Sequence, residues 1–338
     1  MPTKSGRDSF ISDAGRSVAF WSTGPGAGEL RTTVLPEPEP GEVRVRTLFT
    51  GVSRGTEALV ARGEVPESEW ERMRSPFQAG DFPFPVKYGY LNVGVVERGP
   101  AVLVGRTVFT LFPHQSAFVV AAGAVTLVPD GVPPRRAVLA GAVETAVNVL
   151  WDAAPRLGDS IAIVGVGMIG GAIAALAAGI PGVRVTVIDI DQTKRRLAAS
   201  LGVGFARPGD AAGDYDVVIE ASGTGRGLAE ALRVAPTDGD VVVASWYGKS
   251  PQQIDLGTDF HSRRLSLRAS QVGDVATARR GRRTPSQRRQ LALRLLENDV
   301  FDNLLGDNSH WNELPSIMTA LTEGSAGSLC HTIDWSMP

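Results

Sequence analysis

The sequence contains a single cysteine, Cys330, among its 338 residues. One thiol excludes an intrachain disulfide and a metal site built from several cysteines, so we expect a protein of a reducing compartment, in the cytoplasm. No apolar segment follows residues 1–7, and we therefore expect no secretory signal there.

An excess of charge of one sign is also lacking, because 34 basic residues face 36 acidic ones and the net charge is -2. We expect no general attraction to nucleic acid. The local exception is the arginine-rich segment 278–283, followed by Arg288 and Arg289. It predicts a solvated loop and helix start, with a patch that steers an anionic substrate as the alternative.

Residues 161–180 carry no charge and are long enough to span a membrane. Their internal glycines, their acidic flank and the lack of aromatic anchors argue against a span, so we expect no membrane partner. A chain of 338 residues with 43% hydrophobic content exceeds one compact domain, and two domains are expected. No internal repeat or long low-complexity linker is present.

A glycine-rich segment at residues 161–170 begins with a continuous apolar run and has the spacing G-x-G-x-x-G. Gly165 permits a tight turn, Gly167 lets the backbone approach a pyrophosphate, and Gly170 lets the next helix pack closely on the strand. The N-terminus of that helix offers free N–H groups to phosphate. The residues expected at this helix start are Met168 and Ile169. The segment predicts a dinucleotide site, with an ordinary glycine-rich turn as the alternative.

Asp189 ends the next apolar run, residues 183–188, and lies 19 residues beyond the glycine segment. A carboxylate at this place accepts both ribose hydroxyls and repels a 2′-phosphate, which predicts NAD(H) rather than NADP(H). Ile190 and Lys194 are expected beside it, with Lys194 reaching the adenosine ribose.

Short alternating segments broken by Gly and Pro occupy residues 17–129 and predict a mostly β domain. Helical periodicity over 133–151 leads from it into the glycine segment. Strands and helices then alternate, which indicates a parallel doubly wound sheet. The expected strands are 160–165, 184–189, 216–220, 240–245 and 265–270, and the expected helices are 168–179, 192–201 and 226–235.

The last part of the chain is expected to return to the β domain. Helices are predicted over 287–297 and 312–322, and residues 329–333 form an extended tail that rejoins the first domain. The chain is thus divided into a β-rich domain of residues 1–150 and 286–338 and a dinucleotide-binding domain of residues 151–285.

This order of parts resembles the medium-chain dehydrogenase/reductase superfamily over nearly the whole chain. Several blocks look like its bacteriochlorophyllide a dehydrogenase branch: residues 51–57, 85–90, 113–115, 144–146, 245–248, 260–262 and 270–273. The resemblance implies an α/β fold in which a GroES-like β-rich catalytic domain is joined to a Rossmann domain with a doubly wound parallel sheet. It also implies a homodimer formed through the edge of the cofactor-domain sheet.

The sequence departs from the zinc-dependent members of the superfamily. They have a cysteine where this chain has Ser53 and a His-Glu pair where it has Tyr90 and Leu91, and their third ligand position falls near Gly141. An open catalytic zinc site needs three protein donors, so we predict no metal. The histidines are His114, His261, His310 and His331. We expect all except His114, whose loop faces the catalytic cleft by resemblance, to be structural.

Without a metal, side chains must bind and protonate the substrate oxygen. Tyr90 takes the vacated ligand position and is the candidate hydrogen-bond or proton donor. Glu144 is the candidate orienting group or base, with Lys87 or His114 stabilising its charge. The alternatives are a core aromatic for Tyr90 and a structurally paired carboxylate for Glu144.

Further cofactor contacts are implied by the resemblance or by position. Arg54 is expected on the pyrophosphate and Thr145 near the nicotinamide. Residues after the later strands lie at the carboxyl edge of the sheet, where such folds bind ligands. They are Ser222, Ser245, Trp246, Ser270 and Gln271, with plain strand-end turns as the alternative.

These features predict a zinc-independent, NAD(H)-dependent oxidoreductase that interconverts a secondary alcohol and a ketone on a bulky or polar small molecule, in secondary metabolism. One alternative is an enoyl-type reductase, which needs only an enolate stabiliser. The other is a nucleotide-sensing binding protein without turnover. The substrate of the resembled branch does not follow from the fold.

Overall fold

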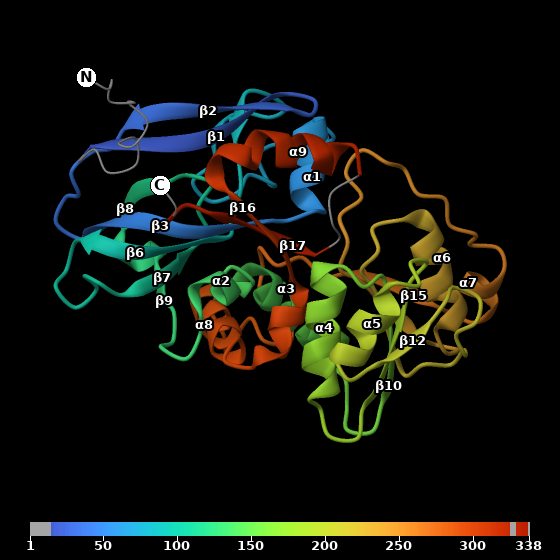
Figure 1. Ribbon diagram of the computed structural model, residues 1–338. Helices are drawn as coiled ribbons and strands as arrows, with labels where there is room; N and C mark the ends of the chain where they lie inside the picture. Colours follow the sequence, from blue (N-terminus) through green and yellow to red (C-terminus); the bar gives the residue numbers. More distant parts are fainter. Residues whose placement is uncertain (1–14, 325–328, 337–338) are drawn as a thin grey trace. The chain divides into compact units, whose positions relative to one another are not determined.

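The computed structural model describes residues 15–324 and 329–336, and the chain divides into two units (Figure 1). Unit 1 is formed by residues 1–138 and 306–338, and unit 2 by residues 139–305. The predicted fold class is confirmed, with a GroES-like β-rich unit and a Rossmann unit. The unit boundaries differ from the expected ones, because residues 139–150 and 286–305 pack with the Rossmann unit. The segment for which we expect no secretory signal lies outside the described residues.

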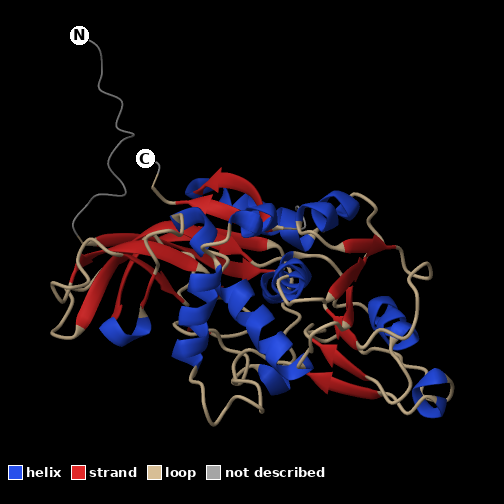
Figure 2. Ribbon diagram, turned by 90° about the horizontal axis from the view of Figure 1, so that it is seen from below, coloured by secondary structure: helices blue, strands red, loops and turns tan. Residues whose placement is uncertain are grey.

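Unit 1 contains two sheets, whose strands are drawn in red in Figure 2. The smaller sheet has the strand order β2-β1-β5-β4, and the larger one the order β16-β17-β3-β6-β7-β9, with β8 paired to β3. The strands are β1 (Arg16–Gly24), β2 (Ala27–Val34), β3 (Glu42–Val52), β4 (Ala79–Gly80), β5 (Val86–Lys87), β6 (Asn92–Arg98), β7 (Thr107–Thr110), β8 (Ala117–Ala121), β9 (Thr126–Leu127), β16 (Leu305–His310) and β17 (Cys330–Asp334).

The C-terminal tail returns to unit 1, as predicted. Strand β17 pairs antiparallel with the end of β3, with His331 opposite Val52. The helices of this unit are α1 (Thr56–Arg62), α2 (Pro134–Ala137) and α9 (Leu314–Thr322). Helices α1 and α9 share an apolar cluster with β17, which fixes the tail against the first strands of the chain.

Unit 2 is built on a parallel sheet with the strand order β12-β11-β10-β13-β14-β15. The strands are β10 (Ser160–Val164), β11 (Arg184–Ile188), β12 (Gly204–Ala206), β13 (Val217–Glu220), β14 (Asp240–Val243) and β15 (Ser266–Ala269). Strand β10 is buried on both faces, as its continuous apolar run predicts. The strand order reverses between β10 and β13, so this pair marks the topological switch point.

The helices of unit 2 are α3 (Ala140–Ala153), α4 (Met168–Ala178), α5 (Lys194–Ser200), α6 (Gly225–Val234), α7 (Asp259–Ser262) and α8 (Pro285–Leu295). The predicted helix over 133–151 is divided into α2 and α3 at residues 138–139. The uncharged run 161–180 is also divided, into β10, a turn and α4. Within the described residues, no helix has the length and apolar character needed to cross a bilayer.

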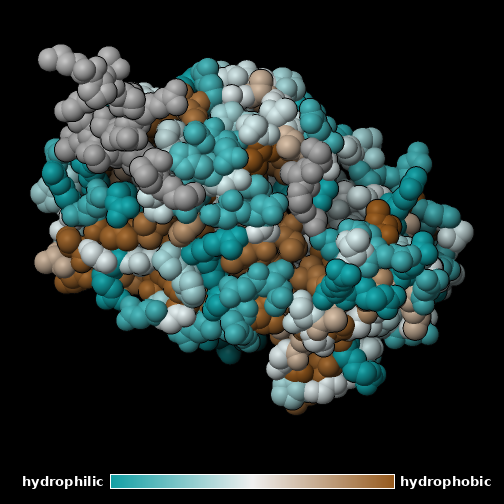
Figure 3. Space-filling model, viewed as in Figure 1, coloured by the Kyte–Doolittle hydropathy of each residue, from teal (hydrophilic) through white to brown (hydrophobic). Residues whose placement is uncertain are grey.

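Apolar side chains fill separate clusters in the two units. On the face drawn in Figure 3, hydrophilic residues predominate, and hydrophobic ones gather in several patches between them. Large exposed hydrophobic residues include Val102, Leu157 and Ile190. Ile190 directly follows Asp189 at the end of β11.

Candidate functional site

The predicted glycine turn lies between β10 and α4 and is tightly constrained. Gly165 has φ +92°, and a Cβ atom on it would lie 2.6 Å from the backbone N of Ser222. A Cβ atom on Gly170 would lie 1.9 Å from the carbonyl oxygen of Gly165. Gly167 is the residue before the first turn of α4. Only glycine satisfies both contacts, and the turn leaves backbone N–H groups at the start of α4 for a phosphate.

Asp189 holds the glycine turn from the end of β11. Its Oδ2 accepts a hydrogen bond of 2.8 Å from the backbone N–H of Val166, and its Oδ1 accepts one of 2.9 Å from Asp191. Lys194, at the start of α5, is largely buried, with 8% of its surface exposed. The pKa of Asp191 is lowered, chiefly by hydrogen bonds from Thr193. The carboxylate of Asp189 thus joins the turn after β10 to the strand end where a ribose is expected.

The predicted strand-end residues fall into two groups. After β13 and β14, the backbone N–H of Gly223 donates to Ser245 Oγ at 2.9 Å, which joins the turns that hold Ser222, Ser245 and Trp246. After β15, Ser270 Oγ donates to Asp152 at 2.6 Å. Gln271 accepts from Gly273 N–H at 2.6 Å. Ser270 is therefore bonded to helix α3, and Gln271 is bonded within its own turn.

Sequence reasoning missed Glu220, the last residue of β13. Its carboxylate is fully buried and accepts hydrogen bonds from Ser222, Gly223 and Tyr247. Burial and the neighbouring carboxylate raise the pKa of Tyr247. A carboxylate at the end of a fully apolar strand was a visible signal, because a buried charge at that point needs dedicated partners.

Thr145 and Arg54 were predicted from the resemblance alone. The Thr145 hydroxyl donates to the carbonyl oxygen of Gly141 at 2.9 Å, one turn earlier in α3. Arg54 is an exposed residue just before α1 in unit 1. Their roles toward a cofactor stay predictions.

In unit 1, Tyr90 is the residue that the resemblance places at a zinc-ligand position, and hydrogen bonds hold its phenol. The Ser53 and Thr56 hydroxyls hydrogen-bond with its phenol. Burial and, secondarily, the charge of Glu57 raise its pKa to about 12. The phenol therefore stays protonated at neutral pH, and because Tyr90 is only partly buried it retains an accessible surface.

Next to Tyr90, His114 and Glu57 form a buried pair. His114 Nε2 lies 2.8 Å from Glu57 Oε2, and Glu57 Oε1 accepts from the Ser53 backbone N–H at 2.8 Å. Gly89 has φ +123°, and a Cβ atom on it would lie 3.0 Å from the His114 ring. The glycine before Tyr90 therefore lets the Tyr90 loop pass closely over the histidine.

The pair is extended to the C-terminal segment. His114 Nδ1 lies 2.7 Å from Thr50 Oγ1, which also accepts from Trp335 Nε1 at 2.9 Å. Glu57 and Trp335 were not predicted. Glu57 lies inside a family-like block, residues 51–57, but only the fold reveals its histidine partner 57 residues away.

Glu144 differs from the prediction. Its Oε1 lies 3.2 Å from Arg288 and its Oε2 lies 3.2 Å from Arg289, so two guanidinium groups of α8 hold both oxygens. The same Arg288 also donates to Asn148 at 2.5 Å. The stabilising cations are thus these arginines rather than Lys87 or His114, and the structurally paired carboxylate is what the fold contains.

Lys87 likewise has another partner. Its Nζ donates to Gln115 Oε1 at 2.7 Å and lies 5.3 Å from the centroid of the Phe112 ring. Burial lowers its pKa. Lys87, in β5, therefore packs against the 112–115 loop, which also contains His114.

The remaining histidines are structural or exposed. His331 Nε2 lies 3.0 Å from Ser309 Oγ between β17 and β16, and His310 Nδ1 accepts from the Asn312 backbone N–H at 3.3 Å. His261 is exposed in α7. In the arginine-rich segment, residues 279–283 are exposed as predicted, whereas Arg288 is buried in the Glu144 pair.

The zinc of related dehydrogenases does not fit these residues. At the positions where the resemblance implies ligands, the chain has a serine hydroxyl, a protonated phenol, the buried apolar Leu91 and Gly141. The single thiol, Cys330, is buried, and burial raises its pKa to about 12. In residues 15–324 and 329–336, no three His, Cys, Asp or Glu side chains are grouped so that they could hold a metal ion. The predicted lack of zinc rests on this donor set and stays a prediction.

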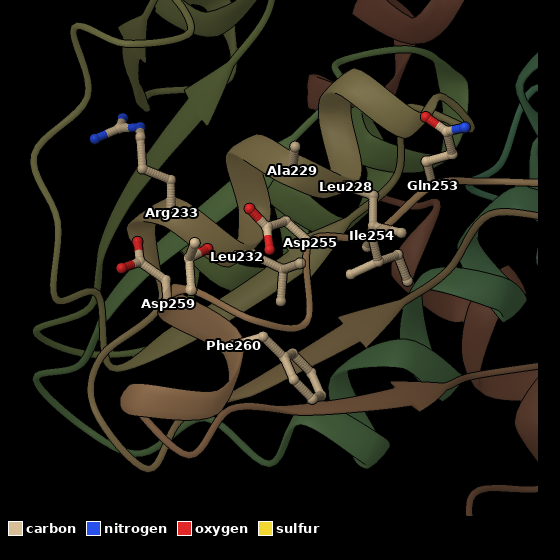
Figure 4. Close-up of a pocket in the computed structure, with 10 residues that line it drawn as sticks. Leu228, Ala229, Leu232, Arg233, Gln253, Ile254, Asp255, Asp259 and Phe260 are labelled. Carbon is tan, nitrogen blue, oxygen red and sulfur yellow. The ribbon is translucent and has the colours of Figure 1, made fainter.

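A separate hollow of about 120 Å³ lies between α6 and residues 253–260 (Figure 4). Leu232, Ile254 and Phe260 line it and belong to, or pack against, the apolar core of unit 2. None of the predicted site residues lines this hollow.

Comparisons with known proteins concern the family and the fold. Residues 165–284 match the family of zinc-binding dehydrogenases. A curated relative, D-guloside 3-dehydrogenase of Shigella flexneri, is 28% identical over 252 residues, 65% of this chain and 71% of its own.

Solved structures share the fold at low sequence identity. L-idonate 5-dehydrogenase from Escherichia coli superposes with a TM-score of 0.77 at 15% identity, covering 94% of this chain and 98% of the other. Acetophenone reductase from Geotrichum candidum, in complex with NAD, gives 0.76 at 18% identity and covers 96% and 98%. Both likenesses concern the whole two-unit fold.

Proposed function

We propose, from the match of residues 165–284 to zinc-binding dehydrogenases and the medium-chain dehydrogenase fold, that this chain is an oxidoreductase of the alcohol dehydrogenase type. We further propose that it uses NAD(H), interconverts a secondary alcohol and a ketone, and works without zinc. The observation that carries the proposal is Tyr90, a protonated phenol held by Ser53 and Thr56 where related enzymes have a zinc ligand.

NAD(H) fits the residues of unit 2. The glycine turn between β10 and α4 would receive the pyrophosphate, Asp189 the adenosine ribose, and the exposed Ile190 the adenine face. A 2′-phosphate on the ribose would meet the Asp189 charge, which favours NAD(H) over NADP(H). When bound, the nicotinamide supplies or accepts a hydride.

The side chains of unit 1 handle the proton. In ketone reduction, the Tyr90 phenol donates a hydrogen bond to the carbonyl oxygen, and its proton passes to the alkoxide that forms there. The phenolate that remains accepts hydrogen bonds from Ser53 and Thr56. Since an alkoxide is a far stronger base than a phenolate of pKa about 12, this transfer is favourable. Burial and, secondarily, the charge of Glu57 raise the pKa of this phenol, so it is protonated between turnovers.

The substrate class follows from relatives and resemblance. The name of D-guloside 3-dehydrogenase describes oxidation of a secondary hydroxyl on a sugar derivative, and acetophenone reductase is named for an aryl ketone. With the resemblance to the bacteriochlorophyllide a dehydrogenase branch, these favour a secondary carbinol on a bulky or polar molecule of secondary metabolism. We also propose that the protein acts in the cytoplasm. We propose that it forms a homodimer through β15, the exposed edge strand of the sheet in unit 2.

The test is a titration of purified, metal-analysed protein with NADH and NADPH, followed by nicotinamide fluorescence and then by turnover of paired ketones and enones. Preference for NADH, no bound zinc and turnover of ketones support the proposal. Turnover of enones alone indicates the enoyl reductase. Tight NADH binding without hydride exchange to any carbonyl indicates the nucleotide-sensing protein, and stoichiometric zinc contradicts the mechanism.

A further inference from the structure

The carboxylate of Glu220 is a buried charge surrounded by neutral donors. Its Oε1 accepts from Ser222 N–H and Oγ–H, both at 2.6 Å, and from Gly223 N–H at 3.0 Å. Its Oε2 accepts from the Tyr247 hydroxyl at 2.8 Å. Four donors on two oxygens match an ionised carboxylate, which only accepts. Because every donor is neutral, these bonds disperse the negative charge without cancelling it.

Glu220 stands at the part of the sheet edge where the proposed function would place the nicotinamide. It ends β13, the strand beside β10 at the topological switch point. Dinucleotides lie across such a point, one half on each side. Asp189, at the end of β11, reads the adenosine ribose on one side, so the nicotinamide half belongs over β13 and β14. The turn after β13 is also the one that Gly165 touches.

The two redox forms of the cofactor differ in the charge of this half. The nicotinamide ring is a cation in NAD⁺ and neutral in NADH. A negative charge in a poorly solvated site stabilises the cation and has no comparable effect on the neutral ring. We propose that Glu220 sets the relative affinity of the chain for NAD⁺ and NADH, favouring the oxidised form. This inference rests on the proposed function, because it assumes that the chain binds the dinucleotide.

Tyr247, in the loop after β14, donates a hydrogen bond to the same charge. Of the four donors described above, only the Tyr247 hydroxyl comes from outside the turn after β13. Removing that hydroxyl leaves the negative charge of Glu220 in place with one hydrogen-bond donor fewer to disperse it. Glu220→Gln and Tyr247→Phe are therefore expected to act in opposite directions, which a merely structural role for the hydrogen bond does not predict.

The experiment measures the dissociation constants of NAD⁺, NADH and ADP-ribose by calorimetry for each protein. Gln is isosteric with Glu, its amide oxygen accepts the three turn donors, and its NH₂ donates to the Tyr247 oxygen, so Glu220→Gln should fold. It is expected to weaken NAD⁺ relative to NADH by about tenfold and to leave ADP-ribose unchanged. Tyr247→Phe is expected to shift the ratio toward NAD⁺.

The matched control is Asp216→Asn. Asp216 directly precedes β13, at the opposite end of the same strand, where it is exposed and accepts from Ser160. Removing its charge should leave the NAD⁺ to NADH ratio unchanged, because water screens it and the whole strand separates it from the carboxyl edge.

The outcomes separate this inference from the proposed function. Wild-type protein that binds neither nucleotide overturns both. Wild-type protein that binds both, with the same ratio in Glu220→Gln, overturns only the role of Glu220. If Glu220→Gln fails to fold, Tyr247→Phe decides: a shift toward NAD⁺ supports the inference, and an unchanged ratio or a shift toward NADH overturns it.

Discussion

His114 and Glu57 share a hydrogen bond of 2.8 Å between Nε2 and Oε2, and each is only 1% exposed. The bond joins the 112–115 loop to the start of α1. A carboxylate and an imidazole that are both shielded from water interact strongly, and the carboxylate charge acts on Tyr90 at short range. The contact that holds Glu57 in place therefore also affects the pKa of Tyr90, the candidate proton donor.

The first prediction concerns Glu57→Gln and pH. Removing the charge lowers the pKa of Tyr90 below about 12, since Glu57 is one of the causes that raise it. Alcohol oxidation needs the phenolate, so its rate should begin to rise at lower pH in the variant than in the wild type. Ultraviolet titration of the phenol should shift in the same direction.

The control for that change is Glu64→Gln, which removes a charge from an exposed carboxylate 3.9 Å from Arg62. Its pH profile should match the wild type. Identical profiles for wild type and Glu57→Gln would show that Glu57 has no electrostatic effect on the proton donor.

The second prediction concerns cofactor choice. Asp189→Ala should abolish the preference for NADH over NADPH, because the ribose loses its acceptor and a 2′-phosphate no longer meets a negative charge. Asp191→Ala, two residues away and fully exposed, should keep most of the preference. The measurement is the ratio of the two dissociation constants by fluorescence, and an unchanged ratio in Asp189→Ala would place the ribose elsewhere.

The third prediction separates backbone strain from close contact. Gly165→Ala combines a left-handed φ of +92° with a Cβ atom 2.6 Å from Ser222 N. Gly158→Ala has a φ of +85° but nothing within 4 Å. Gly158→Ala should lose about 1 kcal/mol of unfolding free energy, whereas Gly165→Ala should lose more and also lose dinucleotide affinity. Urea unfolding and NADH titration test both, and equal losses would disprove the close packing of the turn.

The fourth prediction concerns the Glu144 pair. Arg288→Ala leaves a buried carboxylate with one of its two guanidinium partners and removes the hydrogen bond to Asn148. It should lower the unfolding free energy by about 3 to 5 kcal/mol. Arg282→Ala, on the exposed segment, should change it by less than about 0.5 kcal/mol. Denaturant unfolding compares the two, and a small effect at Arg288 would contradict a structural role for the pair.

Local sequence signals predicted much of unit 2. The apolar run of β10, the three glycines and the acidic end of β11 each act over a few residues, so their pattern is legible in the sequence. The helix predicted over 133–151 was interrupted because residues 138–139 leave helical hydrogen bonding between α2 and α3. Strand β12 and helix α7, with three and four residues, are too short to produce a periodic signal.

The candidate site of unit 1 was less predictable, because its partners are distant in the sequence. Tyr90 and His114 were identified, but the contact of Glu57 with His114 spans 57 residues. Trp335 reaches Thr50, the other partner of His114, through the pairing of β17 with β3. Glu144 shows the opposite case. Apolar neighbours along α3 indicated a buried charge, but its arginine partners lie 144 and 145 residues away on α8.

The most direct test of a zinc-free oxidoreductase is NADH oxidation by a ketone in single turnover, on chelator-treated protein, for the wild type and Tyr90→Phe. The account predicts an unchanged wild-type rate after chelation and a loss of about 10²- to 10⁴-fold in Tyr90→Phe, with NADH affinity retained. Tyr215→Phe, a buried tyrosine in the core of unit 2, is the control and should keep the wild-type rate. Loss of activity on chelation, or an unchanged rate in Tyr90→Phe, would contradict the account.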